Sequence, residues 1–528
     1  MREVSVACIL FVLVVSLRFL SLTGFPDDHY VHLAGAQQML HGEWPSRDFV
    51  DLGAPLTYAI SAAAQAVFGQ RQLTEALLMA TAFGLGAVLT LRAGVMLTGS
   101  IVLALAAALI EVLVYPRTYS YPKIVLYSAA AVALLWYTRR PSRARIVCLA
   151  GLSAFAALVR HDHGLYIGVA SLAAVVLSPA PCDRSNRFRS MALLAGAAVA
   201  FMLPYLIYLQ VVDGIVAHLQ RGMVFTALEV PRQRLTMTGL PMYDAWMLAA
   251  AWLAPVAALA VVALRVFGRK EGAWTSLRPL VPLVVLALIA NAGLIRDRLD
   301  VRLPDAIVPP ALLMAWLVGQ AWKTPPRPLG LAVRIVAVTA LLVTMRYAAV
   351  MGSMEEQLDR AGVYTGLDRI PDRVATLVRE MERPWAGRLV PSAPAGELRP
   401  FFDYVERCIP RDQRLLVAAF LPEVAVLAQR PFAGGQLWFM AGAMTSAADH
   451  ALVMSRLARQ RVPVAVFRRP NYDNLVHDFP ELDEYIKSHF TEVARWSLGD
   501  ADAIYLMMDT TQATGTDAKT GWPCFGKP

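Results

Sequence analysis

Long apolar runs separated by short polar stretches fill the first two thirds of the chain. A bilayer core of about 30 Å needs roughly 20 apolar residues in one helix. A shorter apolar segment, 55–69, fits a helix that lies in the membrane interface. Eleven segments approach the spanning length, and we predict a transmembrane helix in each: 4–23, 72–91, 99–116, 123–138, 145–160, 164–180, 191–211, 244–264, 279–295, 305–322 and 329–351.

The last third of the chain has a different pattern, in which short apolar runs alternate with amphipathic stretches. Strands are predicted at 414–420, 463–467 and 503–508, and helices at 421–430, 446–460 and 479–490. This order is typical of a small α/β domain. We therefore expect a polytopic α-helical membrane protein with a C-terminal soluble α/β domain. The expected divisions are a transmembrane domain at 1–351, a linker at 352–400, the α/β domain at 401–510 and a disordered tail at 511–528.

Composition supports a membrane protein. Of the 528 residues, 57% are hydrophobic and 17% are charged, whereas soluble domains have about 45–50% and 25%. Five cysteines are too few for a disulfide framework, although Cys408 and Cys524 both fall on the predicted outside and could pair. The basic residues are spread between apolar segments, which is unlike a nucleic-acid-binding stripe. The net charge of +9 therefore indicates basic cytoplasmic loops and no nucleic-acid partner.

The loop charges set the orientation. With the N-terminus inside, the predicted inside loops hold sixteen basic residues and three acidic ones, Glu3, Asp183 and Glu271. This asymmetry is what the positive-inside rule predicts, provided that 55–69 does not cross. The basic residues are Arg2, Arg92, Arg139, Arg140, Arg143, Arg145, Arg184, Arg187, Arg189, Arg265, Arg269, Lys270, Arg278, Lys323, Arg327 and Arg334.

The predicted outside carries all nine histidines and most of the aromatic loop residues. Its densest polar cluster opens the first loop, where Asp27, Asp28, His29 and Tyr30 follow the first span directly. Carboxylates at the edge of the membrane are costly unless they have a partner or a function. Two simpler interpretations remain open: Asp27 could cap a helix that starts near Tyr30, and Asp28 could be an ordinary solvated acid.

The first loop resembles that of the GT-C superfamily of integral-membrane glycosyltransferases. The protein O-mannosyltransferases and the bacterial lipid A aminoarabinose transferases are the most similar types. The resemblance rests on the acidic pair, on Gly-x-Trp-Pro at 42–45, on Arg-Asp-Phe at 47–49 and on Pro-Leu-x-Tyr at 55–58. It implies that Asp27 and Asp28 are the catalytic residues, with Asp27 in the catalytic position and Asp28 in place of the family's glutamate. The aminoarabinose transferases have a lysine just before Pro-Leu-x-Tyr, and this chain has none there.

The chemistry of transfer outside the cytoplasm supports the same interpretation. Nucleotide sugars are cytoplasmic, so a sugar carried on a polyprenyl phosphate is the expected donor. The phosphate leaves readily, whereas the acceptor hydroxyl needs a base. One carboxylate suffices, and a single displacement predicts inversion at the anomeric carbon. Partial desolvation would raise the pKa of Asp27 and make it a better base.

The leaving phosphate requires cations, which three outside loops supply. The candidate substrate-binding residues are His29, Tyr30, Arg117, Lys123, Arg160, His161, Asp162, His163, Arg296, Arg298 and Arg302. Simpler interpretations remain for each group. Lys123 could snorkel from its helix end, and the run 296–305 could be a solvated turn whose charges pair internally.

His161, Asp162 and His163 also raise the question of a metal. Three consecutive residues do not easily face one ion, and their spacing matches no zinc motif. We expect no cofactor, with a divalent metal as the weaker alternative, and we expect these residues to bond sugar hydroxyls, to orient the first loop or to form a structural turn. Tyr30, Trp44, Tyr58, Tyr119 and Tyr121 could stack on a sugar or belong to the interfacial aromatic belt. The loop 212–243 could be a lid.

The expected enzyme is thus a glycosyltransferase in a bacterial inner (plasma) membrane, with its N-terminus in the cytoplasm and its C-terminal domain in the periplasm. Its partners would be the lipid bilayer, a polyprenyl-phosphate sugar donor and an acceptor that could be lipid, glycan or protein. The main alternative is a transporter or flippase of a lipid-linked precursor, which would place ionisable residues inside the spans and show a pseudo-symmetric repeat. An acyltransferase or O-antigen ligase would centre on a histidine or on arginines.

Overall fold

The chain folds into two compact units. A computed structural model describes residues 2–526 except 52, 178–183, 233–239, 268–273, 275–276, 296–298, 324–327, 383–397, 438, 440–443, 470 and 499–501. The first unit, here called the helical unit, comprises Met1–Ser21, Leu77–Ile207 and Val230–Ile370. The second, here called the mixed unit, comprises Leu22–Ala76, Tyr208–Glu229 and Pro371–Pro528. The first loop therefore groups with the C-terminal residues and not with the spans that flank it.

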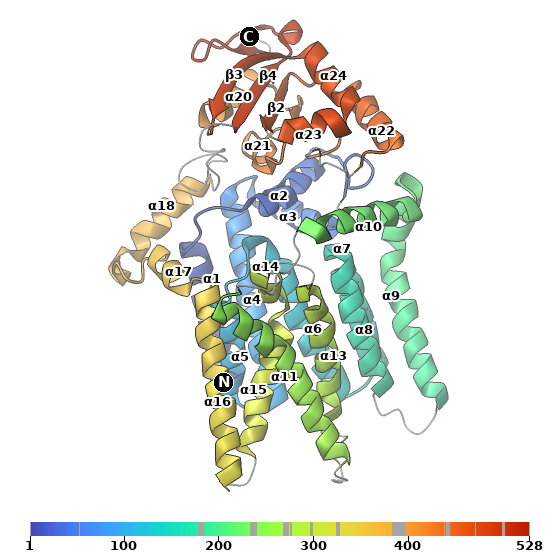
Figure 1. Cartoon of the computed structure of the whole chain (residues 1–528), viewed down its shortest axis with the longest axis vertical. Helices are drawn as coiled ribbons and strands as arrows, with labels where there is room; N and C mark the ends of the chain where they lie inside the picture. Colours follow the sequence, from blue (N-terminus) through green and yellow to red (C-terminus); the bar gives the residue numbers. More distant parts are fainter. Residues whose placement is uncertain are drawn as a thin grey trace. The chain divides into compact units, whose positions relative to one another are not determined.

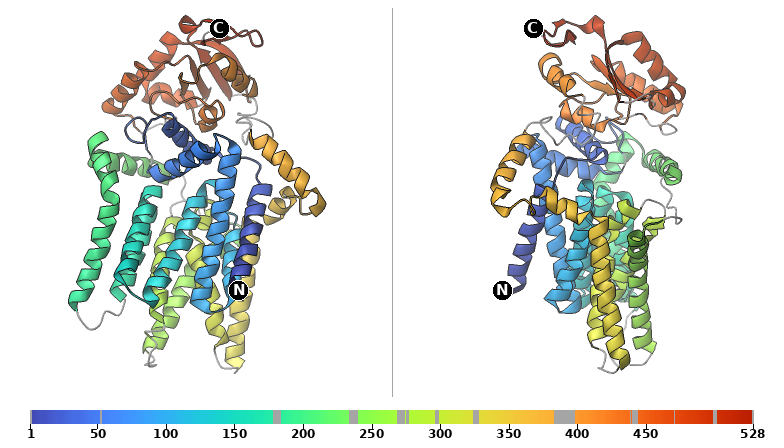
Figure 2. Two further views of the ribbon diagram at one scale, coloured as in Figure 1. Left: turned by 180° about the vertical axis from the view of Figure 1, so that it is seen from behind. Right: turned by 60° about the vertical axis from the view of Figure 1, so that its left-hand side comes forward.

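The long helices of the helical unit run side by side, as both views in Figure 2 show. Its main helices are α1 (Arg2–Leu20), α4 (Gln72–Thr98), α5 (Ile101–Leu113), α6 (Tyr121–Arg139), α7 (Arg143–Val159), α8 (His161–Leu177), α9 (Arg184–Val212), α11 (Met242–Phe267), α13 (Val281–Ala292), α14 (Leu299–Ala306), α15 (Val308–Trp322), α16 (Pro328–Met351) and α17 (Met354–Arg360). Each of the eleven predicted spans coincides with one of these helices. Five of them, α1, α4, α9, α11 and α16, are long and apolar enough to cross a membrane.

Local sequence explains where several of these helices begin. Ser100 and Ser142 are the N-caps of α5 and α7, and each side chain accepts a hydrogen bond from the backbone N–H three residues later. Such caps satisfy amide groups that the helix leaves unpaired. Proline occupies one of the first two positions of α6, α13 and α15, where its missing N–H costs nothing.

The mixed unit combines helices with a small sheet (Figure 1). Its helices are α2 (Asp27–Leu40), α3 (Pro55–Phe68), α10 (Ile215–Arg232), α18 (Ile370–Glu382), α20 (Arg399–Cys408), α21 (Pro422–Leu427), α22 (Ala447–Leu457), α23 (Asn471–Asp478) and α24 (Pro480–His489). The main sheet has the order β1 (Leu415–Val417), β2 (Val464–Arg469), β4 (Ala503–Met508), β3 (Thr491–Ser497). β1 and β2 are parallel, and the other two pairings are antiparallel.

Two hydrophobic clusters hold the mixed unit together. The first lies between the sheet and helices α22 to α24 and includes Phe467, Leu475 and Ile486. The second joins the first loop to the C-terminal residues, because Phe49 and Tyr58 pack with Phe432 in one cluster. Burying one such aromatic side chain contributes about 2 kcal/mol. The first loop is thus part of the core of the C-terminal domain.

The predicted fold class is confirmed, and the predicted α/β elements all occur. Strand β3 was not predicted, because Glu492 and Arg495 are exposed on it and such polar side chains are typical of edge strands. The loop 212–243, predicted as a lid, contains helix α10, whose Val216, Leu219 and Met223 are exposed.

The prediction of a disordered tail was wrong. The structure describes residues 511–526 as ordered, with a second sheet of β5 (Gly515–Thr516) and β6 (Pro523–Cys524). Cys524 forms a disulfide with Cys408, and Phe525 N–H donates to the Cys408 carbonyl oxygen at 2.8 Å. Arg407 also pairs with Asp517 at 2.8 Å. The low apolar content of the tail suggested disorder, but covalent and polar contacts fix it.

Candidate active site

Asp27 and Asp28 are the first two residues of helix α2. The N-cap is Pro26, which forms no side-chain cap hydrogen bond. The simpler interpretation, in which Asp27 caps the helix, is therefore wrong. Its carboxyl group is half-buried, and that of Asp28 is exposed. The helix dipole favours a negative charge in the first helical turn, so the start of α2 can carry both carboxylates.

The surroundings of Asp27 change its acidity. Burial raises the pKa of Asp27, and the charge of Asp28 raises it further. The guanidinium group of Arg468 lowers the pKa of Asp27, and so does a backbone hydrogen bond of Asp27 itself. A carboxyl group with a raised pKa is a stronger base once it is ionised, which suits proton transfer from an alcohol.

The next two residues of α2 face the interior of the mixed unit. His29 and Tyr30 are buried, at 1% and 0% exposure. His29 Nε2 lies 2.9 Å from Glu75 Oε1, and Ser61 donates a short hydrogen bond to the other oxygen of Glu75. Tyr30 Oη accepts a hydrogen bond from Gln72 at 3.4 Å. The two predicted substrate-binding residues thus position the start of α2 in this structure.

The C-terminal domain contributes charged groups beside Asp27. Arg468 is the last residue but one of strand β2, and Glu423 lies in the first turn of α21, which follows strand β1 in the chain. Hydrogen bonds from Arg468 to Asp502 raise the pKa of Arg468, and the charges of Glu423 and Asp27 add to this effect. Burial raises the pKa of Tyr30, and the charges of Glu423 and Asp27 raise it further. Asp27, Tyr30, Glu423 and Arg468 therefore form one electrostatic cluster.

Sequence analysis did not identify Arg468 or Glu423, which are roughly four hundred residues from Asp27 along the chain. One signal was present. Both follow predicted strands, and the carboxyl ends of parallel strands are where α/β folds usually build their sites.

Two glutamines fasten α2 to the C-terminal domain. Gln37 Nε2 donates to the carbonyl oxygens of Ala425 and Arg430, at 3.1 and 2.8 Å. Gln38 bonds both backbone groups of Phe432, each at 3.3 Å. Both glutamines are buried, so their amide groups and the backbone groups that they contact satisfy one another's hydrogen bonds in place of water.

Further contacts fasten the segment after α2. Arg414 pairs with Glu43, and Val50 N–H donates to the Gly435 carbonyl oxygen at 2.9 Å. Gly435 has a φ of +73°, and an added Cβ would lie 2.6 Å from the Asp48 carbonyl oxygen. Only glycine allows both the backbone conformation and this close approach.

The motif residues of the first loop have mainly structural roles here. Asp48 accepts hydrogen bonds at 2.8 Å from the Trp44 backbone and from Arg47. Phe49 and Tyr58 are buried in the cluster with Phe432. Trp44 is half-exposed, at 50%. Of the aromatic residues in these motifs, Trp44 is the one accessible to a sugar or to lipid headgroups.

The helical unit holds a separate group of charges at the start of α6 and in α14. Lys123 is buried and lies 2.7 Å from Asp305 Oδ2. Its amino group is 5.2 Å from the centre of the Tyr119 ring, and the charges of Arg160 and Arg302 also act on it. Three of the predicted phosphate partners therefore meet in one group, here called the basic group. Its carboxylate, Asp305, was not predicted as the partner of Lys123.

The residues at the start of α8 also join this group. Arg160 Nε lies 3.0 Å from Asp162 Oδ1, and His163 Nδ1 lies 2.6 Å from the Tyr127 hydroxyl. His161 is exposed, whereas His163 is buried. Across the residues that the structure describes, no three His, Cys, Asp or Glu side chains are arranged to hold a metal ion.

Of the remaining predicted cations, Arg117 contacts the tyrosine that lies against Lys123, and the other two cannot be placed. Arg117 donates to the Tyr119 hydroxyl at 3.3 Å. Arg296 and Arg298 lie outside the described residues.

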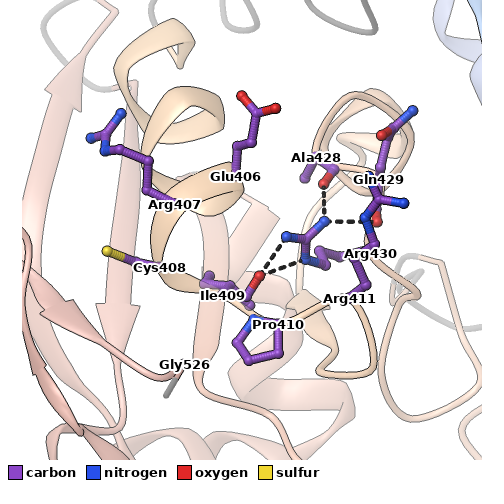
Figure 3. Close-up of a pocket in the computed structure, with 10 residues that line it drawn as sticks. All are labelled: Glu406, Arg407, Cys408, Ile409, Pro410, Arg411, Ala428, Gln429, Arg430 and Gly526. Carbon is purple, nitrogen blue, oxygen red and sulfur yellow. Dashed lines mark hydrogen bonds between the residues drawn. The ribbon is translucent and has the colours of Figure 1, made fainter. Parts of the chain in front are cut away.

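The C-terminal domain also has a cavity of about 340 Å³ beside the disulfide (Figure 3). Arg430 fills one side of it and donates to the carbonyl oxygens of Ile409 and Ala428, at 3.0 and 3.2 Å. These carbonyls follow the ends of α20 and α21, so Arg430 joins two helix C-termini. Burial lowers the pKa of Arg430 to about 10. The cavity contains none of the predicted site residues, and its buried arginine is already bonded.

Together, the fold and the electrostatic cluster define a polytopic α-helical membrane protein with a half-buried aspartate, Asp27, at the start of α2. No family model matches the chain, and no curated protein matches it. Among solved structures, it is similar to the crystal structure of ArnT from Cupriavidus metallidurans in the apo state, with 14% sequence identity and a TM-score of 0.45. The match covers 96% of this chain and 97% of that one. At this identity the likeness concerns the fold.

Proposed function

We propose that this protein is a membrane glycosyltransferase of the GT-C type. It transfers a sugar from a polyprenyl-phosphate donor to an acceptor hydroxyl on the periplasmic side, with inversion at the anomeric carbon. The observation that carries the proposal is the half-buried Asp27 at the start of α2, whose pKa burial raises. A base of this kind accepts the proton of the attacking hydroxyl.

The basic group of the helical unit is the proposed phosphate site. Lys123, Arg160 and Arg302 supply three positive charges, against the two carboxylates Asp305 and Asp162. Arginine and lysine at interface depth suit a lipid-linked phosphate. Once the sugar leaves, the negative charge that grows on the phosphate would find cations already in place.

The transporter alternative predicts functional charges inside the spans. Arg18 and Glu111, which are buried in α1 and α5, lie in the last turns of these helices. Arg18 donates to the Pro116 carbonyl oxygen at 2.8 Å and stacks on the Phe83 ring. These contacts give Arg18 a structural role, so Arg18 does not support the transporter alternative.

The test compares envelope lipids and glycans by mass spectrometry in cells that carry the wild type, Asp27→Asn or Asp473→Asn. We expect Asp27→Asn to lower the amount of one glycosylated product by about 10²–10⁴-fold, the range for a lost general base. Asp473→Asn, at an exposed position in the first turn of α23, is the matched control and should retain most of the product. Unchanged glycans in Asp27→Asn cells, at normal protein levels, would refute the proposal.

A further inference from the structure

The end of strand β2 brings the C-terminal domain to the proposed base. β1 and β2 are parallel, so their carboxyl ends share one edge of the sheet. Helix α21 begins at that edge and packs against α2, as Figure 1 shows. Arg468 lies at the same edge, and its charge acts on Asp27.

Arg468 is held in place from its own sheet. Its Nε and Nη2 atoms donate to the two carboxylate oxygens of Asp502, with Nε at 2.8 Å. Asp502 immediately precedes β4, which pairs with β2 so that Arg468 lies opposite Ile504. A bidentate pair of this kind fixes the plane of the guanidinium group. Asp502 thus orients the guanidinium group whose charge acts on Asp27.

The charged groups around Asp27 act in opposite directions. Burial and Asp28 favour the protonated carboxyl, whereas Arg468 favours the carboxylate. Glu423 on α21 and Tyr30 on α2 belong to the same electrostatic cluster. Among these named side chains, Arg468 is the cation. Without it, the other groups would leave Asp27 protonated to a higher pH.

We propose that Arg468, oriented by Asp502, is a positioning residue that keeps the carboxylate of Asp27 in its proton-accepting form. The inference rests on the proposed function, since a base must be ionised before it accepts a proton. It gives the C-terminal domain a direct part in the reaction. The cation that prepares the base then comes from the domain and not from the membrane helices.

Chemical labelling tests the electrostatic link without any assay of transfer. Dicyclohexylcarbodiimide adds to protonated carboxyl groups, giving an O-acylisourea that rearranges to a stable N-acylurea. The full-length protein in lipid nanodiscs is labelled across pH 4 to 9, and mass spectrometry quantifies the adduct on Asp27. At neutral pH we expect Arg468→Gln to raise the labelling rate by roughly threefold, the effect of losing a partly screened opposite charge. At acid pH, where Asp27 is protonated in both proteins, the rates should be equal.

Two variants act as controls. Arg469→Gln removes the neighbouring charge, which lies 5.5 Å from the centre of the Tyr505 ring, and should label like the wild type. Arg468→Lys keeps the charge and should restore most of the wild-type profile. If Arg468→Gln and Arg469→Gln both follow the wild-type curve at every pH, the inference is wrong.

A second measurement separates this inference from the proposed function. In cells grown at several external pH values, the product of Arg468→Gln should be depleted at low pH and recover as the pH rises. A product that depends on Asp27 but not on Arg468 would overturn this inference alone. A shifted labelling curve without any product that depends on Asp27 would overturn the proposed function.

Discussion

At the scale of single residues, Asp27 shows a conflict between stability and function. Burial raises its pKa in the folded protein, so ionisation costs more there than in the unfolded chain. The contribution of Asp27 to stability is therefore most favourable at low pH, where its carboxyl group is protonated in both the folded and the unfolded state. Stability is lost as the pH rises from the ordinary aspartate range through the raised pKa of the folded state. Functional sites commonly retain such unfavourable groups.

Asp27→Asn should therefore stabilise the protein at neutral pH while removing its activity. We expect its melting temperature to lie above that of the wild type at pH 7 and to approach it as the pH falls below 4. Differential scanning fluorimetry in detergent measures this difference. Asp28→Asn, at an exposed position, should show little change. A destabilised Asp27→Asn at pH 7 would contradict the argument.

Lys123 allows a structural role to be separated from a binding role. Lys123→Met should lower the free energy of unfolding by about 3–5 kcal/mol, because it breaks the buried ion pair and leaves the carboxylate of Asp305 without a compensating charge. The double variant Lys123→Met/Asp305→Leu removes both charges and should recover most of that stability. If Lys123 also binds phosphate, the double variant remains inactive. Thermal melting and glycan mass spectrometry distinguish the two roles, and a stable, active double variant would exclude Lys123 from the phosphate site.

At the scale of elements, helix α2 depends on polar bonds to the C-terminal domain. Gln38 is fully buried, and its amide bonds the backbone of Phe432 and the side chain of Glu43. Gly35 allows α2 to approach α3, because an added Cβ would lie 2.9 Å from the Tyr58 ring. The helix that carries Asp27 is thus held on two sides.

Gln38→Ala should lower the free energy of unfolding by about 1–3 kcal/mol, because it leaves buried backbone groups of Phe432 unpaired. Gln220→Ala on α10, at an exposed helical position, is the matched control and should change it by less than about 0.5 kcal/mol. Urea titrations followed by tryptophan fluorescence would measure both. Equal values for the two variants would show that the Gln38 bonds do not fasten the helix.

The elements also show what the sequence could predict. Apolar run length located a helix at each of the eleven predicted spans, because a bilayer requires long apolar runs, and five of these helices reach the spanning length in the described part of the chain. Short apolar runs located β1, β2 and β4, but the edge strand β3 contains no such run. The acidic residues of the site could be chosen from their place after the first span. Their partners Arg468 and Glu423 could not, since only the folded chain brings the strand ends to α2.

At the scale of the whole molecule, the mixed unit is assembled from three distant stretches of chain. The apolar cluster of the first loop is completed by Ala425, Phe432 and Leu437 from the C-terminal domain. Without that domain, Phe49 and Tyr58 would be exposed to water, and the bonds of Gln37 and Gln38 would be lost. The domain is therefore part of the framework of the site, and more than an accessory.

A chain truncated after residue 370 should insert in the membrane but lose the structure of its first loop. Ser61, 1% exposed in the full chain, reports on this after Ser61→Cys in a background with Cys8, Cys148 and Cys182 replaced by serine. We expect a maleimide to label a cysteine at position 61 about tenfold faster in the truncated chain. Local opening of the first loop there no longer has to disrupt the hydrophobic cluster that it forms with the C-terminal domain. A cysteine placed at the exposed Val67 is the control and should react equally in both chains. Equal protection of position 61 in the two chains would show that the first loop folds without the C-terminal domain.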